Sequence, residues 1–243
     1  MRNIGLIFLF FLFQTFQIAL AQATQEEKNL YSWFDKELGV ENTRLLNGAE
    51  YVEKYRTVNE KNSFFLSGAL ITGSVLYEDE WFHGVQMKYN VHENILIVQV
   101  ESNLGVNIIQ LRTENLQRFE FDQFRFININ APESIFNGIN EVLLEKSQLT
   151  LLKKHSLKLT AKTDQFIQYY EFIPRRIRYG YSYNNVYYEF NSRRELASQF
   201  PELKELITDF FKNNNYLYKN QQDTFMVNLF KEITGRLSKE ESL

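Results

Sequence analysis

The chain has 243 residues, a formal net charge of −3 and no cysteine. The lack of cysteine excludes thiolate catalysis, cysteine-ligated zinc, iron–sulfur clusters and a lipid-modified N-terminal cysteine. The mixed, slightly acidic charge argues against a nucleic-acid partner, because nucleic-acid binders usually carry a basic stripe. The 22 Phe and 14 Tyr against 10 Gly and 3 Pro favour continuous strands joined by tight turns.

The N-terminal residues have the order of a secretory signal peptide. Arg2 precedes an apolar run over residues 4–13, and the segment closes on the small-x-small pattern Ala-Leu-Ala, ending at Ala21. The run is shorter than the about 20 residues of a membrane-spanning helix, although an uncleaved N-terminal anchor is the alternative. We expect cleavage after Ala21, which leaves a mature chain with no transmembrane segment.

A signal peptide without any cysteine in the mature chain also predicts a location. Export to an oxidising compartment commonly goes with disulfides, but a chain of this size can bury enough apolar surface without them. We therefore expect an exported protein in the periplasm or on the outer surface of a Gram-negative bacterium.

After the signal peptide, residues 1–21, the pattern divides the chain into three segments. Residues 22–62 are mixed and contain a short amphipathic helix near 26–38. Residues 63–190 read as an antiparallel β domain, and residues 191–237 as C-terminal helices packed on that same domain.

Period-two patterns and turn residues define the β domain. Apolar residues alternate with polar ones over 85–91, and the pairs Asp122-Gln123 and Asn184-Asn185 are typical of two-residue hairpin turns. Strands joined by such short links leave no room for crossover helices, so their neighbours should be antiparallel. The fold class is therefore mainly β (α+β): an antiparallel meander of about ten strands, forming a curved sheet or a partly closed barrel.

The pattern becomes helical after Asn191. Ser192 and Glu195 form a capping box that opens a helix over 193–200, and Pro201 is suited to the first turn of the next helix. We expect the Asn-rich stretch 213–222 to break that helix, and a last helix to run from residue 223 to about 235 before a frayed tail. This gives two to three C-terminal helices.

No catalytic constellation, metal site or cofactor site is recognisable. The sequence lacks a nucleophile elbow, a phosphate-binding glycine loop and a zinc-binding histidine pair on a helix. The three histidines, His83, His92 and His155, are interpreted as residues of strands, turns or the surface. The alternative for His83 is a metal or acid–base cluster with Asp79 and Glu80 of the neighbouring turn. Carboxylates that could pair across a cleft are numerous, and nothing selects two of them; they include Asp79, Glu80, Glu120, Asp122 and Glu171.

The stretch IRYGYSYNNVYYEF, residues 177–190, offers a ladder of tyrosines. On a strand, Tyr179, Tyr181 and Tyr183 share one face, and Tyr188 follows the turn. Exposed, these four rings could bind sugars or an extended peptide. Facing inward, they would form a wall beneath the apolar stripes of the C-terminal helices. We favour the wall and keep ligand binding by these four tyrosines as the alternative.

Several stretches together resemble a known group of proteins. They are LLNGAEYVEKY, FFLSGALITGSVLYEDEWFHGVQMKYNVHENILIV, LLKKH and YYEFNSRRELASQFPELKELI. The chain is similar over most of its mature length to an uncharacterised family of exported Bacteroidota proteins, in which a signal peptide precedes a β-rich domain and a helical end. That family has no assigned activity, so the resemblance implies location and architecture but no catalytic residues.

The sequence thus favours a non-enzymatic cell-envelope protein that acts as a binding or interaction module. An exposed strand edge could recruit another envelope protein by β-augmentation. The first alternative is a periplasmic carrier of an apolar ligand such as a lipid, held between a curved sheet and its helices. The second is a hydrolase of envelope polysaccharide.

Cleavage of the signal peptide can be tested directly. We expect the intact mass of the protein purified from the envelope fraction to match a chain that begins at Gln22, because Ala21 completes the cleavage pattern. A full-length chain that stays in the inner membrane would contradict this prediction.

Overall fold

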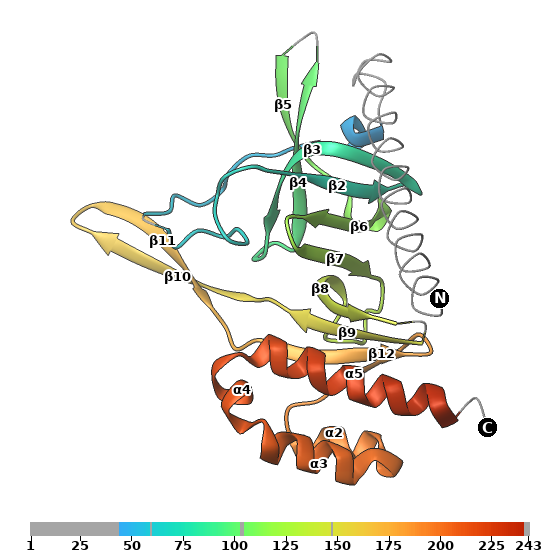
Figure 1. Cartoon of the computed structure of the whole chain (residues 1–243). Helices are drawn as coiled ribbons and strands as arrows, with labels where there is room; N and C mark the ends of the chain where they lie inside the picture. The colour runs from blue at the N-terminus through green and yellow to red at the C-terminus, as the bar shows by residue number, and fades with distance from the viewer. Residues whose placement is uncertain (1–43, 59, 103–104, 147, 241–243) are drawn as a thin grey trace, which may run out of the picture.

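The computed structural model describes residues 44–240, apart from residue 59, residues 103–104 and residue 147 (Figure 1). The expected signal peptide and the expected helix near 26–38 lie outside these residues. Strands of the described part form one antiparallel sheet in the order β1-β5-β4-β3-β2-β6-β7-β8-β9-β12-β13, and β10 and β11 form a separate two-stranded sheet.

The strands have the following bounds: β1 Ala49–Glu50, β2 Ile71–Tyr77, β3 Glu80–Asn90, β4 Ile95–Ser102, β5 Gly105–Gln110, β6 Leu116–Phe121, β7 Phe124–Ile129, β8 Gly138–Glu145, β9 Leu149–Lys154, β10 Leu157–Asp164, β11 Ile167–Pro174, β12 Arg178–Tyr183 and β13 Val186–Glu189. The mainly β fold with an antiparallel sheet is confirmed. The sheet is curved and not closed, because its two edge strands, β1 and β13, do not pair with each other.

Sequence neighbours pair within β2–β5, within β6–β9 and between β12 and β13, as a meander predicts. The order departs from a simple meander in three places. β1 pairs with β5 rather than with β2, and β6 pairs with β2 rather than with β5. β12 pairs with β9 after the chain has left the sheet to form β10 and β11. β10, residues 157–164, was not predicted as a separate strand, although residues 157–162 alternate between apolar and polar side chains.

The predicted turns connect their hairpins as expected. Asp122 has φ 50° between β6 and β7, and Asn184 and Asn185 have φ 49° and 63° between β12 and β13. Asn184 and Asn185 both have positive φ, which is the requirement of a type I′ turn and which asparagine tolerates. The alternation over residues 85–91 is also confirmed, since Val85, Met87, Tyr89 and Val91 are buried.

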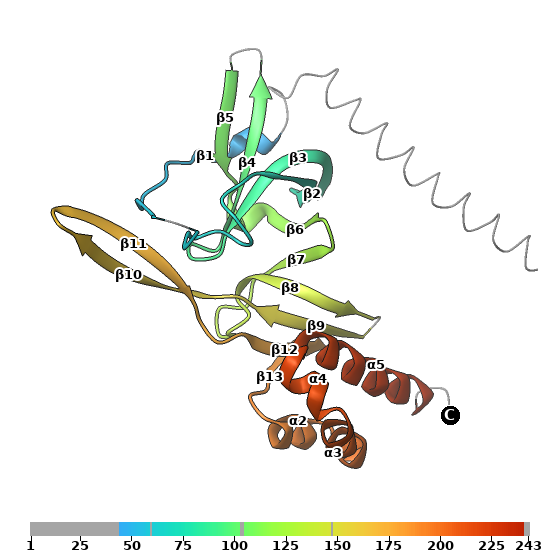
Figure 2. The same ribbon diagram turned by 60° about the vertical axis from the view of Figure 1, so that its left-hand side comes forward.

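Helices α2 (Arg193–Gln199), α3 (Lys204–Asn213), α4 (Asn215–Asn220) and α5 (Gln222–Glu240) follow the sheet. Ser192 caps α2 by accepting the N–H of Glu195, and the Glu195 carboxylate accepts the N–H of Asn191. Figures 1 and 2 show α2–α5 gathered on one side of β9 and β12. No helix in the described part of the chain is long and apolar enough to cross a membrane.

α3 ends at Asn213, in the stretch 213–222 that was expected to break it, but residues 215–220 of that stretch form α4, which was not predicted. The expected frayed end after residue 235 was wrong. The Tyr218 ring lies 5.1 Å from the rings of both Phe211 and Phe225, so packing outweighs the low helix propensity of the asparagines and forms α4. α5 continues to Glu240 because Leu237 still packs against the core beneath it.

Two clusters of buried side chains make up most of the core. The first lies over β2–β8 and is dominated by aromatic rings in mutual contact: Phe65, Tyr89, Phe119, Phe121 and Phe126. The second joins β8, β9, β12 and Phe190 to the apolar stripes of α2, α3 and α5. A third, smaller cluster contains Phe136, Val142 and Leu152.

Gly180 of β12 is required by this packing. A Cβ at this position would overlap the ring of Phe136, which is fully buried. We expect Gly180→Ala to lower the free energy of unfolding by about 1–3 kcal/mol, as overpacking of a core usually does. Urea unfolding of the two single variants and of the double variant with Phe136→Leu measures this. The double variant should be more stable than the sum of the two losses predicts, and strict additivity would contradict the proposed overlap.

Candidate functional site

The four tyrosines of the predicted ladder lie at the junction of the sheet with the helices. Tyr179 and Tyr181 are buried, at 6% and 2% exposure, and Tyr183 and Tyr188 are half-buried against the second core cluster. The Tyr181 hydroxyl donates to Gln199 Oε1 of α2 at 3.1 Å, and its ring stacks on Tyr188. The structure therefore places Tyr179 and Tyr181 beneath the helices. Ligand binding by the ladder stays a prediction.

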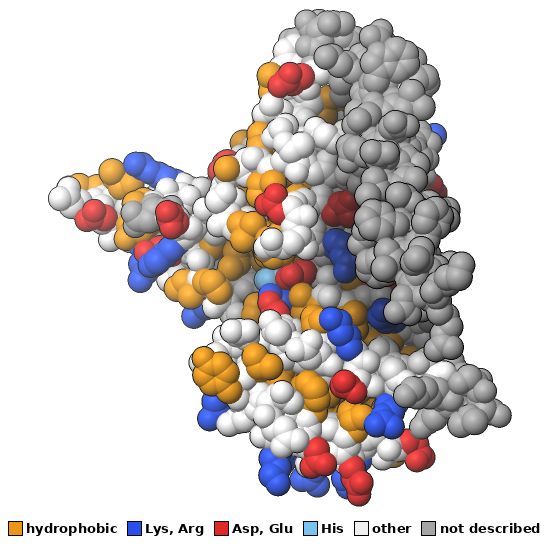
Figure 3. All heavy atoms as spheres, viewed as in Figure 1, with side chains coloured by type: hydrophobic (Ala, Val, Ile, Leu, Met, Phe, Trp, Pro, Cys, Tyr) orange, Lys and Arg blue, Asp and Glu red, His pale blue; other side chains and the backbone are white. Residues whose placement is uncertain are grey.

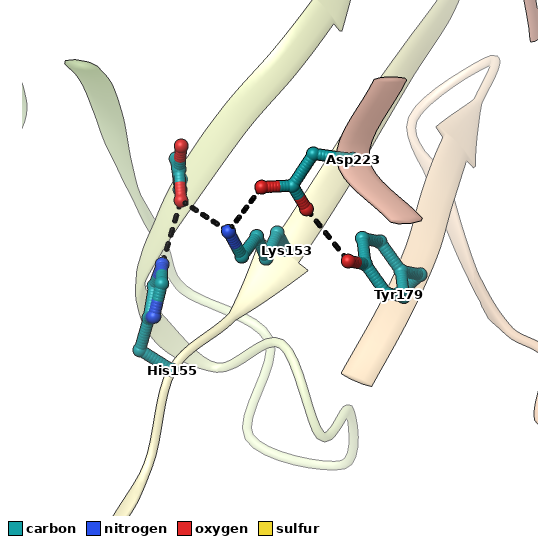
Figure 4. Close-up of polar contacts among 5 residues, drawn as sticks. Lys153, His155, Tyr179 and Asp223 are labelled. Atoms are coloured by element: carbon teal, nitrogen blue, oxygen red, sulfur yellow. Dashed lines mark hydrogen bonds and ion pairs between the residues drawn. The ribbon is translucent and has the colours of Figure 1, made fainter. Parts of the chain in front are cut away.

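Tyr179 belongs to a row of polar side chains that crosses β8, β9 and β12 and ends at α5 (Figure 4). The row consists of Glu141, Lys153, His155, Tyr179 and Asp223. Cross-strand pairing places Glu141 beside Lys153 and Lys153 beside Tyr179. Because cross-strand partners point to the same face of a sheet, these three side chains meet on the face that the helices cover.

The contacts of the polar row form a continuous chain. Glu141 Oε2 lies 2.6 Å from His155 Nε2 and 3.4 Å from Lys153 Nζ. Lys153 Nζ lies 2.7 Å from Asp223 Oδ2, and the Tyr179 hydroxyl donates to Asp223 Oδ1 at 2.6 Å. Asp223 is in the first turn of α5. The polar row thus fastens the start of α5 to the sheet.

The contacts of Asp223 and Tyr179 shift the pKa values of both groups. Burial alone would raise the pKa of the Asp223 carboxyl, but the hydrogen bonds from Lys153 and Tyr179 outweigh burial and lower it. Burial and the bond to Asp223 raise the pKa of the Tyr179 hydroxyl. Asp223 is therefore held ionised and Tyr179 neutral.

This arrangement does not match a hydrolytic carboxyl pair. A glycosidase keeps one carboxyl protonated through a raised pKa so that it can act as an acid, whereas the pKa of Asp223 is lowered. The other carboxyl of the row, Glu141, is 5% exposed and contacts the side chains of Lys153 and His155. The polar row fits an electrostatic connection between sheet and helix.

Sequence reasoning missed most of the polar row. His155 was interpreted as a surface residue, but its side chain is only 15% exposed and its ring lies 5.0 Å from that of Phe65. Glu141 and Asp223 were not among the candidate carboxylates. The only local signal was the spacing of Lys153 and His155, two residues apart and therefore on one face of a strand.

The candidate carboxylates lie on separate elements. Asp79 and Glu80 are at the β2–β3 turn, where Asp79 accepts from Gln117 and Glu80 faces Arg44. Glu120 is on β6 and Asp122 in the turn that follows it, whereas Glu171 of β11 pairs with Lys61. The described residues contain no group of three or more His, Asp or Glu side chains that could hold a metal ion.

His83 and His92 also have ordinary surroundings. His83 Nδ1 lies 2.8 Å from the Ser74 hydroxyl, and its ring stacks on Trp81. The His92 ring is in edge contact with Tyr55 and Phe172. These contacts account for both rings by packing on their neighbours.

Burial lowers the pKa of the Lys154 amine to about 8. Its Nζ donates to the carbonyl oxygens of Asn137 and Ile139, at 2.8 and 3.1 Å. Through these two contacts Lys154 of β9 holds the end of the loop before β8.

The most prominent feature outside the core is the hairpin of β10 and β11, residues 157–174, which we call the arm. It projects away from both the sheet and the helices (Figures 1 and 2). The arm is an excursion between two paired strands, because Lys154 of β9 and Arg178 of β12 are cross-strand partners at its root. The main sheet therefore does not depend on the arm for its continuity.

The lower half of the arm is held by an extended stretch of the chain between β1 and β2. The amides of Tyr170 and Phe172 donate to the carbonyl oxygens of Arg56 and Lys61, at 2.9 and 3.0 Å. The Tyr55 ring packs edge-on against the rings of both residues. This support ends at Tyr170.

The outer half of the arm has no such support from the described residues. All eight residues of 161–168 are exposed. Phe166, in the two-residue turn, is 99% exposed, and Ile167 beside it is 50% exposed. Hydrophobic side chains are visible along the arm in Figure 3, interspersed with charged ones.

The free edge of β10 presents backbone hydrogen-bonding groups. In an antiparallel pair, two opposite residues either bond to each other or both turn their N–H and C=O outward. Tyr170 and Phe172 turn theirs outward to Arg56 and Lys61, so their partners Ala161 and Leu159 turn theirs outward on the other edge. In the described part of the chain, β10 pairs with β11 alone.

Comparison of the chain with protein-family models, with curated proteins and with solved structures finds no match.

The polar row predicts how stability depends on pH. Because the Asp223 pKa is lowered on folding, ionised Asp223 stabilises the folded state above its unfolded pKa of about 3.9. This stabilisation is lost as the pH falls through the lower folded value. We therefore expect the stability difference between the wild type and Asp223→Asn to shrink below about pH 4 in urea unfolding experiments.

The matched control is Asp209→Asn, which removes an exposed carboxyl of α3. Its unfolding free energy should run parallel to that of the wild type over the same pH range. If the Asp223→Asn difference were equally constant, Asp223 would not connect α5 to the sheet through its charge.

Proposed function

We propose that this protein is a non-enzymatic module of the cell envelope that binds another protein through its arm. The observation that carries the proposal is the fully exposed outer half of the arm, residues 161–168, with Phe166 at its tip. An isolated two-stranded hairpin is marginally stable in water. A hairpin that extends beyond its support and presents a phenylalanine to solvent is best explained by a partner that covers it.

The outward amides of β10 suggest how the partner binds. On its other side, the arm already pairs with an extended segment of its own chain at Tyr170 and Phe172. We propose that a strand of the partner pairs with the free β10 edge at Leu159 and Ala161 in the same manner, by β-augmentation.

The side chains of β10 suggest what kind of strand the partner supplies. Lys158 and Lys162 lie on one face of the arm, and Leu159 and Ala161 lie on the other. Acidic residues opposite the two lysines would each contribute about 0.2–1 kcal/mol as cross-strand pairs. The lysines would also disfavour uncontrolled pairing of the edge with neutral strands. The preferred partner is thus an extended segment with acidic residues on one face.

Two observations favour this function over the alternatives. A carrier that encloses a whole lipid over β2–β8 would need space there, and that face is filled by the rings of the first core cluster. A hydrolase would need a carboxyl pair with separated pKa values, and the polar row binds its carboxylates to Lys153 and Tyr179.

Location in the envelope rests on the signal peptide and on the family resemblance, both of which concern the sequence alone. Placement in the periplasm or on the outer surface would expose the arm to other envelope proteins. No cofactor is part of the proposed function.

Site-specific photocrosslinking in the source cell tests the proposal. A photoactivatable phenylalanine analogue at position 166 should give one discrete crosslinked protein. Ala161→Pro should reduce its yield about tenfold, because a hydrogen bond left unmade in an interface costs about 1–3 kcal/mol. Ala161→Ser keeps the N–H and should crosslink as the wild type does.

The same analogue at Tyr216 is the control for position, since Tyr216 is 74% exposed but lies on α4. The joint change Lys158→Glu and Lys162→Glu should also reduce crosslinking from position 166. The same product from both positions, or a yield unaffected by Ala161→Pro, would contradict binding along the β10 edge.

A further inference from the structure

A cavity of about 380 Å³ lies far from the arm, between the last turns of α5 and the ends of β9 and β12. This volume is within the range of about 300–1,000 Å³ that small-molecule sites usually have. Its wall on the helix side is formed by Lys231, Thr234, Gly235 and Ser238. Their spacing of three and four residues places them on one face of α5.

The sheet side of the cavity has an apolar part beside Lys146 and Gln148. Leu149 is 1% exposed and Tyr183 is half-buried, and both line the cavity together with Leu237 of α5. Leu149 and Tyr183 are cross-strand partners at the end of the β9–β12 pairing. Tyr183 is the one member of the predicted tyrosine ladder that lines this cavity.

Among the described residues that line the cavity, the charged ones are Lys146 and Lys231, and both are exposed. Neither ammonium has an ion-pair partner among the described residues, whereas Lys153 is paired with Asp223 and Lys61 with Glu171.

Gly235 keeps the helix side of the cavity open. A glycine inside a helix costs about 0.5–1 kcal/mol relative to alanine, so packing or function usually explains its presence. Packing does not explain it here, because a Cβ added at Gly235 would meet nothing within 4 Å. A side chain at this position would occupy the cavity instead.

We infer that this cavity binds a small organic anion. Its carboxylate or phosphate group would lie between Lys146 and Lys231, and its apolar body would pack on Leu149, Tyr183 and Leu237. The Thr234 and Ser238 hydroxyls donate to the helix carbonyl oxygens of Lys231 and Gly235, so the two lysines supply the polar contacts to the anion. This site is independent of the arm, so either assignment can fail without the other.

Titration of the isotope-labelled protein with octanoate, followed by NMR, tests the inference. Octanoate should shift the amide signals of Thr234 and Gly235 saturably. Octanol, which has the same chain without the charge, should bind about tenfold more weakly at low salt, and the difference should narrow as salt rises. Equal binding of the two probes, or no saturable shift at α5, would overturn the inference.

Three variants locate the ligand. The joint change Lys146→Gln and Lys231→Gln should bring octanoate affinity down to that of octanol. The control Lys212→Gln, an exposed lysine of α3, should leave octanoate affinity unchanged. Gly235→Leu should block binding by filling the cavity, and octanoate binding that survives it would place the ligand elsewhere and overturn the site.

Gly235→Ala separates binding from folding. It should raise the thermal midpoint by about 1–4 °C through helix propensity while weakening octanoate. A lowered midpoint would mean that the Cβ meets other atoms and that the cavity is not open.

Sedimentation with phosphatidylglycerol vesicles, against phosphatidylcholine vesicles, distinguishes the source of the anion. Binding to phosphatidylglycerol that is lost in the double lysine variant would assign a lipid headgroup. Octanoate binding without vesicle binding would assign a free organic anion.

Discussion

The pairing of β9 with β12 is the constraint on which the rest of the architecture depends. It runs from Lys154 opposite Arg178 to Leu149 opposite Tyr183, across strands separated by the whole arm. At the first end the arm leaves the sheet, and at the second end the cavity beside α5 opens. Between the two ends, the pairing aligns Lys153 with Tyr179 and Leu151 with Tyr181, which gives the helices a mixed polar and apolar surface to pack on.

The two halves of this surface do different work. Leu149, Leu151 and Tyr181 join the apolar stripes of the helices, which supplies non-directional stabilisation. Lys153 and Tyr179 both contact the Asp223 carboxylate, at 2.7 and 2.6 Å. Both contacts can form only when the start of α5 is in this position on the sheet. Such a polar connection fixes the register of a helix on a sheet more closely than apolar contact does. The position of α5 in turn sets the wall of the cavity at Lys231 and Gly235.

Local patterns predicted the parts of this fold that local chemistry determines. The turns at Asp122 and Asn184-Asn185, the alternation over 85–91 and the cap at Ser192 each depend on residues close in sequence. Strand order could not be predicted in this way, because the pairing of β6 with β2 and of β12 with β9 depends on contacts distant in sequence. α4 was missed for the same reason, since Tyr218 is held by Phe211 and Phe225.

The candidate sites were less accessible to sequence reasoning than the fold. The residues of the polar row come from β8, β9, β12 and α5. Each element contributes only one or two of them, so no sequence motif predicts that they meet. The expectation of an exposed strand edge for β-augmentation did not specify a strand, and β10 itself was not recognised. The segment LKLTAKTD does alternate apolar and polar residues over 157–162, which is the local signal that could have revealed this strand.

The account holds that the outer arm serves binding and not folding. Replacing residues 163–168 by Asn-Gly would join Lys162 to Tyr169, which are already cross-strand partners, by a type I′ turn. The decisive measurement is crosslinking of this shortened chain, with a photoactivatable analogue at Lys158, compared with the full-length arm carrying the same analogue. We predict that the crosslinking yield falls, because Phe166 and Ile167 are removed while the β10 edge at Leu159 and Ala161 remains. The thermal midpoint should stay within about 2 °C, because the removed residues are exposed. An undiminished yield, or a large fall in the midpoint, would contradict the account.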